Sequence, residues 1–179
     1  MLSSKRLQFR KMVESDIETY HSWRNDLDVM KTTSPSLDVY SLHETRSFVE
    51  NIILNSTSSR SYIIEEKESN TAIGVTSLIN IDTKNRNAEC IIDIGEKEHW
   101  GKGYGTEALK MLLEYAFLEL NLHRVSLRVF SFNERAIHIY NKLGFKKEGV
   151  IRESLYRNGN WHDIITMGIL KREYTGKQS

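Results

Sequence analysis

The chain has 179 residues, 39% of them hydrophobic and 27% charged, a composition typical of a water-soluble globular protein with one domain over residues 1–179. Its 25 basic and 24 acidic residues nearly cancel, so charge gives no reason to expect nucleic acid or an anionic membrane as a partner. The N-terminus lacks the apolar core of a signal peptide, and no stretch is long enough to span a membrane. We therefore expect a cytoplasmic protein.

The N-terminal part of the chain predicts one strand and two helices. Residues 7–9 alternate apolar and polar side chains, as in a strand. Capping-box patterns that start at Ser15 and Ser41 predict helices continuing to about Trp23 and Ile53. The segment between these helices contains the only proline, which predicts a loop with room for one more helical turn.

The middle of the chain changes from strands to a helix. Apolar runs at 62–65, 72–81 and 88–94 are separated by short polar turns, which predicts an antiparallel meander. After Gly105 the apolar positions recur at helical spacing as far as Phe117. This pattern predicts an amphipathic helix.

The C-terminal part completes a sheet covered by helices. It predicts a strand at 125–130, a helix at 133–143, and two closing strands over about 145–151 and 161–170. The Asn-Gly pair at 158–159 is a typical hairpin turn between the last two strands. Because this order is not a regular βαβ alternation, it predicts a mixed sheet flanked by helices.

A glycine-rich turn at residues 100–105, Trp-Gly-Lys-Gly-Tyr-Gly, lies between a predicted strand and the predicted amphipathic helix. Its three glycines remove side chains where a ligand would approach the backbone, and the free amides of the helix N-terminus suit a phosphate. Lys102 adds a positive charge. Taken alone, the turn is explained equally well as a tight start to a helix. Its spacing fits neither a P-loop nor a dinucleotide-binding fingerprint.

A second pattern follows downstream: Asn133-x-x-Ala136-x-x-x-Tyr140-x-x-x-Gly144-Phe145. In order and separation, the glycine-rich turn and this pattern together resemble the two-part signature of the GCN5-related N-acetyltransferase (GNAT) family. Trp100 departs from the usual Gln or Arg of that signature. In this respect the chain resembles the branch that contains ribosomal-protein N-terminal and spermidine acetyltransferases. The resemblance covers about residues 7–170.

The resemblance implies the GNAT fold, an α/β (α+β) arrangement in which about four helices flank a mixed, mostly antiparallel twisted sheet of about seven strands. It also implies an N-acetyltransferase that uses acetyl-CoA as co-substrate. The acetyl group would pass to a primary amine by direct attack in a ternary complex. The acceptor is left open between a polyamine such as spermidine, a peptide or protein N-terminus, and an amino sugar.

The resemblance also implies where coenzyme A binds. Backbone amides of the glycine-rich turn would hold the pyrophosphate, and the strand before it would bind the pantetheine arm like an added strand. A backbone amide of that strand would polarise the thioester carbonyl. The coenzyme-binding residues implied in this way are Ile92, Asp93, Ile94, Trp100, Gly101, Lys102, Gly103, Tyr104, Gly105, Thr106, Asn133, Ala136 and Tyr140.

Two side chains are candidates for proton transfer. Asn133, Ala136 and Tyr140 share one helix face, and the resemblance makes Tyr140 the proton or hydrogen-bond donor to the coenzyme sulfur. A core tyrosine is the alternative interpretation. Glu89 resembles the catalytic glutamate of several family members, and apolar neighbours would raise the pKa of such a carboxylate toward that of a base. The alternative is a strand-edge glutamate that aids solubility or positions the substrate.

The acceptor is expected in a groove between the early helices and the last hairpin. Trp23, Asn25 and Asp26 fall at the end of the first predicted helix, a common place for binding residues. Tyr156 and Asp163 lie in the closing hairpin. Together with Glu89, these residues are our candidates for binding the acceptor, because Asp26 and Asp163 would attract a cationic amine.

Other functional classes remain open alternatives. A regulatory domain that binds coenzyme A without turnover would keep the glycine-rich turn, but the presence of Tyr140 and Glu89 argues against it. A nucleotide-binding module would prefer ATP or NAD. The six histidines show no metal-ligand spacing, so no metal is expected, and Cys90 in its apolar run predicts a buried, inert thiol. Relatives in this branch are often oligomers, which leaves a homo-oligomer possible.

Overall fold

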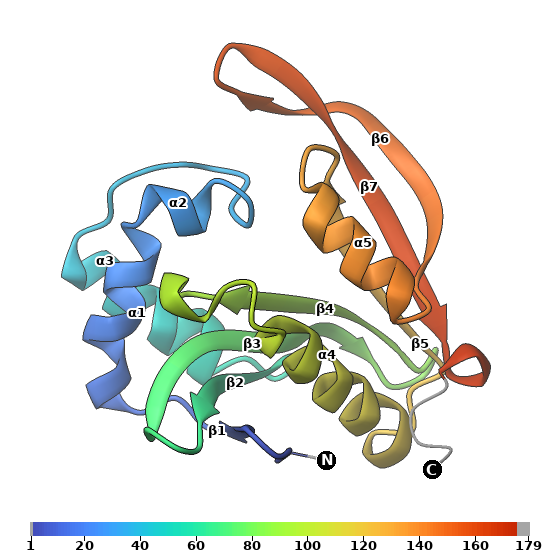
Figure 1. The fold of residues 1–179 in the computed structure, drawn as a ribbon, viewed down its shortest axis with the longest axis horizontal. Helices are drawn as coiled ribbons and strands as arrows, with labels where there is room; N and C mark the ends of the chain where they lie inside the picture. The colour runs from blue at the N-terminus through green and yellow to red at the C-terminus, as the bar shows by residue number, and fades with distance from the viewer. Residues whose placement is uncertain (1, 175–179) are drawn as a thin grey trace.

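A computed structural model describes residues 2–174 and contains one seven-stranded sheet (Figure 1). The strands are β1 (Leu7–Arg10), β2 (Arg60–Glu66), β3 (Thr71–Asp82), β4 (Asn87–Ile94), β5 (Arg124–Phe130), β6 (Lys146–Arg157) and β7 (Asn160–Leu170). They lie in the order β1-β2-β3-β4-β5-β7-β6, and every neighbouring pair is antiparallel except the parallel pair β4–β5. The predicted mixed, mostly antiparallel sheet is confirmed.

The helices also follow the predicted order. They are α1 (Ile17–Arg24), α2 (Leu27–Met30), α3 (Leu42–Phe48), α4 (Tyr104–Glu114) and α5 (Glu134–Lys142). The short α2 is the extra turn within the segment that was expected to be a loop. Both α3 and α4 continue into wider π-helical turns. No helix within residues 2–174 is long and apolar enough to cross a membrane.

Two separate cores form on the two faces of the sheet. On one face, α4 and α5 pack over side chains such as Ile64 and Leu78. On the other face lie α1 to α3 (Figure 1), and the buried residues there include Trp23, Ile63 and Val75. Ile63 and Ile64 serve opposite cores because successive side chains of a strand point to opposite faces.

Alternation along β4 decides which of its side chains face which core. Cys90 is buried in the α4 core, and burial raises the pKa of its thiol to about 12, in keeping with the inert thiol expected. Asp93 pairs directly with Val75, a member of the opposite core. Directly paired residues point to the same face of a sheet. Glu89 and Asp93 therefore point toward α1 to α3.

One of the two predicted helix starts is correct. At α3, the Ser41 hydroxyl accepts from the amide of Glu44, whose carboxylate accepts from the amide of Ser41. The capping box predicted at Ser15 does not form, because a 3-10 turn precedes α1. Asp16 occupies the N-cap position, and its side chain accepts from the amide of Val13 rather than capping α1.

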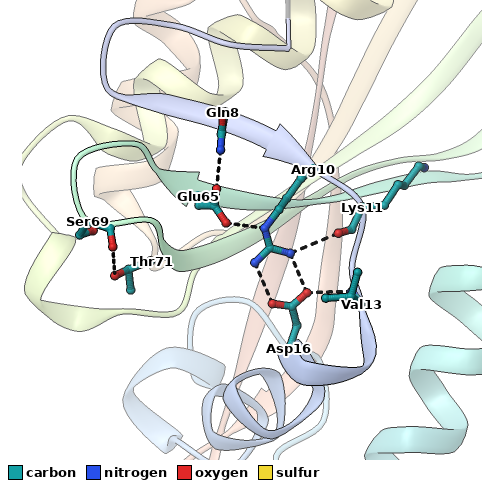
Figure 2. A network of polar contacts seen from close by, with 8 residues as sticks. All are labelled: Gln8, Arg10, Lys11, Val13, Asp16, Glu65, Ser69 and Thr71. Carbon is teal, nitrogen blue, oxygen red and sulfur yellow. Dashed lines mark hydrogen bonds and ion pairs between the residues drawn. The ribbon is translucent and has the colours of Figure 1, made fainter.

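A buried ionic network joins β1, β2 and the start of α1 (Figure 2). The guanidinium of Arg10 donates to both carboxylate oxygens of Asp16, at 2.7 and 2.8 Å. Its Nε donates to Glu65, which also accepts from Gln8. The side chains of Asp16 and Glu65 are only 8% and 10% exposed, so Arg10 compensates two buried negative charges.

The last hairpin is longer than its sequence predicts, because β6 continues six residues beyond the expected end at Ile151 to Arg157. The β6–β7 pairing is irregular between Ile151 and Leu155, where Glu153 has a φ of 49°. The Asp163 carboxylate accepts from the amide of Glu153 and closes this bulge. The hairpin projects well away from the rest of the sheet (Figure 1).

Candidate active site

The candidate cleft begins where β4 and β5 separate. Their parallel pairing covers only Asn87–Glu89 against Arg124–Ser126. Beyond these pairs the two strands line a cavity of about 310 Å³, which we call the strand-gap cavity. Strand edges without a neighbour carry unpaired N–H and C=O groups. An extended ligand arm can therefore bind there by strand-like hydrogen bonds.

A second cavity of about 240 Å³, the glycine-loop cavity, lies at the N-terminus of α4. Gly101 and Gly103 have φ of 78° and 83°, in the left-handed region that disfavours other residues. Gly103 is the N-cap residue of α4, and no side chain caps this helix. The first amides of α4 therefore have no intrahelical acceptor and are available to an anion.

The indole of Trp100 closes the wall of the glycine-loop cavity next to β4. Its Nε1 donates to the carbonyl of Ile94 at 2.8 Å, which fixes the turn to the end of the strand. The residue that departs from the family signature therefore holds the glycine-rich turn in place.

The two cavities adjoin each other. Six residues line both of them: Thr32, Thr33, Ile92, Asp93, Asn133 and Ala136. A ligand anchored at the N-terminus of α4 can therefore reach the gap between β4 and β5. Of the expected coenzyme-binding residues, Lys102 lies outside the cleft, where its backbone carbonyl accepts from Arg6 at 3.0 Å.

The start of α5 supplies polar groups to both cavities. Asn133 is its N-cap residue, and the side-chain oxygen accepts from the amide of Ala136 at 3.2 Å. This bond leaves the side-chain nitrogen of Asn133 as a donor. Asn133 therefore has a structural role in addition to the ligand contact expected of it.

Tyr140 projects from α5 into the strand-gap cavity. Burial raises the pKa of its phenol, and the nearby Cys90 and Asp93 raise it further. Within residues 2–174 its hydroxyl has no hydrogen-bond partner. At neutral pH the phenol therefore keeps its proton and is free to donate it into the cavity.

Glu89 lies in the strand-gap cavity but not among purely apolar neighbours. Arg128 of β5 donates to its carboxylate, with Nε to Oε1 at 2.8 Å. The Glu89 side chain is 19% exposed, and this ion pair crosses from β4 to β5. The apolar environment expected from its neighbours in sequence is therefore wrong, because Arg128 comes from a strand that is distant along the chain.

Asp93 has a different environment from Glu89. Burial raises the pKa of its carboxyl group to about 6. No hydrogen bond or ion pair involves this side chain in the described part of the chain. Asp93 was expected to contribute only its backbone, and no local pattern predicted that its carboxylate would lie unpaired in the cleft.

Three residues predicted to bind the acceptor instead stabilise the fold around α1. Trp23 is buried, and its ring packs so closely on Gly95 that a Cβ there would lie 2.1 Å from it. Asn25 accepts from the amide of Tyr40 and donates to its carbonyl. Asp26 caps α2 and pairs with Lys97 at 2.7 Å. None of the three lines the cleft.

The two candidates in the last hairpin also lie outside the cleft. Tyr156 is 60% exposed and packs against the ring of Trp161, with the centroids 5.0 Å apart. The Asp163 carboxylate is used by the bulge in β6. From this hairpin, the strand-gap cavity receives Ile164 instead. The two cavities are therefore lined mainly by β4, the glycine-rich turn, β5, α5 and the segment after α2, and Ile164 is the one residue of the hairpin among them.

The segment after α2 provides residues that sequence analysis missed. Thr32 and Thr33 line both cavities. The buried Arg157 holds this segment, since its guanidinium donates to the carbonyls of Lys31 and Ser34. The positions of the two threonines depend on this long-range anchor, so no local signal in the sequence could identify them.

Arg135 is a further residue that was missed. It lines the glycine-loop cavity, and its Nη2 lies 3.9 Å from the point that a Cβ on Gly101 would occupy. The sequence signal that could have identified Arg135 was a basic residue next to Ala136, inside the second motif. The free amides of α4, the two glycines and Arg135 together fit the phosphates of a coenzyme. Within residues 2–174, no cluster of His, Cys, Asp or Glu could hold a metal ion.

The chain is similar to several known proteins. A family model described as an acetyltransferase (GNAT) domain matches residues 6–146. The uncharacterized N-acetyltransferase p20 of Bacillus licheniformis is 34% identical over 98% of both chains. The spermidine N(1)-acetyltransferase of Escherichia coli K12 is 32% identical, over 97% of this chain and 91% of its own.

A solved structure is similar over nearly the whole chain. It is the crystal structure of the spermidine N-acetyltransferase from Vibrio cholerae in complex with CoA and spermine. It aligns with a TM-score of 0.87 at 29% identity, over 96% of this chain and 99% of that one.

Proposed function

Because this chain belongs to the GNAT acetyltransferase family and is an N-acetyltransferase, we propose that it acetylates a primary amine of a polyamine such as spermidine. The donor is acetyl-CoA, and the chain acts as a single domain. The main support for this function is the continuous cleft that runs from the uncapped N-terminus of α4 to the protonated Tyr140. Relatives named as spermidine acetyltransferases support the choice of acceptor.

The glycine-loop cavity and the strand-gap cavity bind different parts of acetyl-CoA. Amides from Gly101 to Thr106 hold the pyrophosphate, with Arg135 as an added positive charge. The edge of β4 from Ile92 to Ile94 pairs with the pantetheine arm, and the side-chain nitrogen of Asn133 donates to it. Acetyl-CoA supplies a thioester, whose acetyl carbon is open to attack by a neutral amine.

Tyr140 and Glu89 act in the strand-gap cavity. Tyr140 donates its proton, or a hydrogen bond, to the sulfur as it leaves. Glu89, whose carboxylate is paired with Arg128, lines the same cavity and contributes to the acceptor site by its shape and position. Asp28 and Asp93 add two acidic side chains to the glycine-loop cavity. Polyamines carry several positive charges, so the Asp93 carboxylate, which pairs with no cation within residues 2–174, suits a polyamine better than a neutral amine.

Removal of the Arg135 charge should weaken acetyl-CoA binding. In Arg135→Ala we expect the KM for acetyl-CoA to rise about tenfold with little change in kcat, because one charge-assisted contact to phosphate is worth about 1.4 kcal/mol. Steady-state kinetics at fixed spermidine measures both constants. The exposed Arg172, outside the cleft, gives the control Arg172→Ala. An unchanged KM in Arg135→Ala would remove Arg135 from the binding site.

Release of the coenzyme A thiol from acetyl-CoA tests the proposed function directly. The acceptors compared are spermidine, spermine, short peptides with free N-termini, and amino sugars. Saturable release with the two polyamines is the expected result. Release with peptides or amino sugars alone would overturn the polyamine assignment. Folded protein that releases no thiol with any of them would overturn the proposal as a whole.

A further inference from the structure

We propose that Asp93, and not Glu89, accepts the proton that the acceptor's ammonium group must lose before it attacks the thioester. The proposal rests on the proposed function and adds a catalytic residue to it. It follows from the position of the Asp93 carboxylate, its lack of partners and the electrostatics of the cleft.

Position is the first argument. Asp93 is the one titratable residue, among those the structure describes, that lines both the glycine-loop and the strand-gap cavities. Its side chain points toward α1 to α3, the face where the segment after α2 covers the cleft. An acceptor entering under Thr32 and Thr33 therefore meets Asp93 where the two cavities join.

Availability is the second argument. A general base needs a carboxylate that is free to take a proton. Glu89 is engaged by Arg128, and Asp28 is engaged by Lys31 at 2.8 Å. By contrast, Asp93 has no hydrogen bond and no ion pair within residues 2–174. Its oxygens still reach the cavities, because they are not among the fully buried unsatisfied atoms of this region.

The titratable groups around Asp93 come from several elements of the fold. Two phenols lie close enough for its charge to raise their pKa values: burial is the main cause for Tyr20 of α1 and Tyr140 of α5, and Asp93 adds to it in both. Both stay protonated and neutral near pH 7. The remaining ionisable groups of the glycine-loop cavity are Asp28, Lys31, His99, Tyr104 and Arg135.

In the strand-gap cavity, the ionisable groups that share the space with Asp93 are Glu89, Arg128, Cys90 and Tyr140. The Glu89 and Arg128 charges offset each other in their ion pair, and burial keeps the Cys90 thiol neutral. Within residues 2–174 no cation pairs with Asp93, and burial raises the pKa of its carboxyl group to about 6. Such a carboxylate is ionised at pH 7 and still basic enough to take a proton.

The proton and electron balance of the reaction is then complete. The ammonium group gives one proton to Asp93, and the nitrogen lone pair forms the bond to the acetyl carbon. The C–S bond breaks with its electron pair on sulfur, which takes a proton from Tyr140. The second proton lost by nitrogen restores the Tyr140 phenol, and Asp93 releases its proton to solvent. The products are the N-acetylated amine and coenzyme A thiol.

The pH dependence of kcat distinguishes Asp93 from Glu89. With saturating acetyl-CoA and spermidine, the wild-type rate should rise with pH through about 6, as Asp93 ionises. In Asp93→Asn we expect kcat at pH 7.5 to fall about a hundredfold and this rise to disappear. Asp93→Glu, which keeps a carboxylate, should retain the rise at a lower rate. Glu68→Gln, in an exposed turn, is the charge-removal control.

Each outcome has a defined meaning. If Asp93→Asn keeps the wild-type rate and acidic limb, or if Glu89→Gln alone removes that limb, Asp93 is not the base. Thermal stabilisation by acetyl-CoA checks that each variant is folded and binds the coenzyme. A wild-type protein that releases no thiol would overturn the proposed function itself. An active wild type with an unaffected Asp93→Asn variant would overturn only the role of Asp93.

Discussion

Tyr140→Phe should lower kcat about a hundredfold while acetyl-CoA affinity stays nearly unchanged, because proton transfer by a positioned side chain typically contributes 10²–10⁴-fold. Burial raises the pKa of this phenol, so the proton is present across the neutral range. Phenylalanine keeps the ring and its contact with Phe145, and removes only the hydroxyl. Thiol release gives kcat, and calorimetric titration with acetyl-CoA gives the affinity.

A matched control for Tyr140 is Tyr174→Phe. Tyr174 packs against Phe117 outside the cleft, so loss of its hydroxyl should leave turnover unchanged. If Tyr140→Phe turned over at the wild-type rate, Tyr140 would have no role in the mechanism. A large loss of acetyl-CoA affinity in the same variant would instead assign its hydroxyl to binding.

Arg10→Met should lower the free energy of unfolding by about 3 kcal/mol, because removal of one partner leaves buried charges uncompensated. The carboxylates of Asp16 and Glu65 would lose the guanidinium that contacts both (Figure 2). Urea denaturation at pH 7 measures the change. The exposed Arg152 gives the control Arg152→Met, for which we expect a change within about 0.5 kcal/mol. A loss below about 1 kcal/mol in Arg10→Met would contradict the proposed importance of this network.

The same network makes stability depend on acid pH. Burial acts to raise the pKa of Asp16, but hydrogen bonds from Arg10 and Val13 outweigh it and the pKa is lowered. Arg10 is the main cause that lowers the pKa of Glu65. Groups with lowered pKa values stabilise the fold above their ordinary values, here 3.8 and 4.5, and this stability is lost as pH falls further. The difference between wild type and Arg10→Met should therefore shrink below about pH 4.5.

The order of elements was predictable because its signals are local. The alternation of apolar residues and their helical spacing can each be recognised within a few residues of sequence. The same is true of the glycines with positive φ at the start of α4. The capping box at Ser41 is also local, and it forms. At Ser15 the same pattern does not form a capping box, because the Asp16 carboxylate instead accepts a hydrogen bond from Arg10 of β1.

The chemical environment of the site was less predictable, for a related reason. The surroundings of Glu89 and Asp93 look alike in the sequence, where each sits in an apolar strand. The fold brings Arg128 to Glu89 and leaves Asp93 without a partner among residues 2–174, and both outcomes depend on β5 and the segment after α2. Trp23 and Tyr156 are typical binding residues by type, but one is a core side chain and the other lies on an exposed hairpin.

The short pairing of β4 with β5 has a consequence for how the protein unfolds. The sheet consists of two leaves, β1 to β4 and β5 to β7, each held by antiparallel pairing, and within residues 2–174 only three residue pairs join them, along one seam. This seam is the shortest strand pairing within residues 2–174, and it borders the cleft. A ligand arm that pairs with both strand edges adds hydrogen bonds across this seam and joins the leaves into one cooperative unit. Occupancy of the cleft and cooperativity of unfolding are thereby linked through the same strand edges.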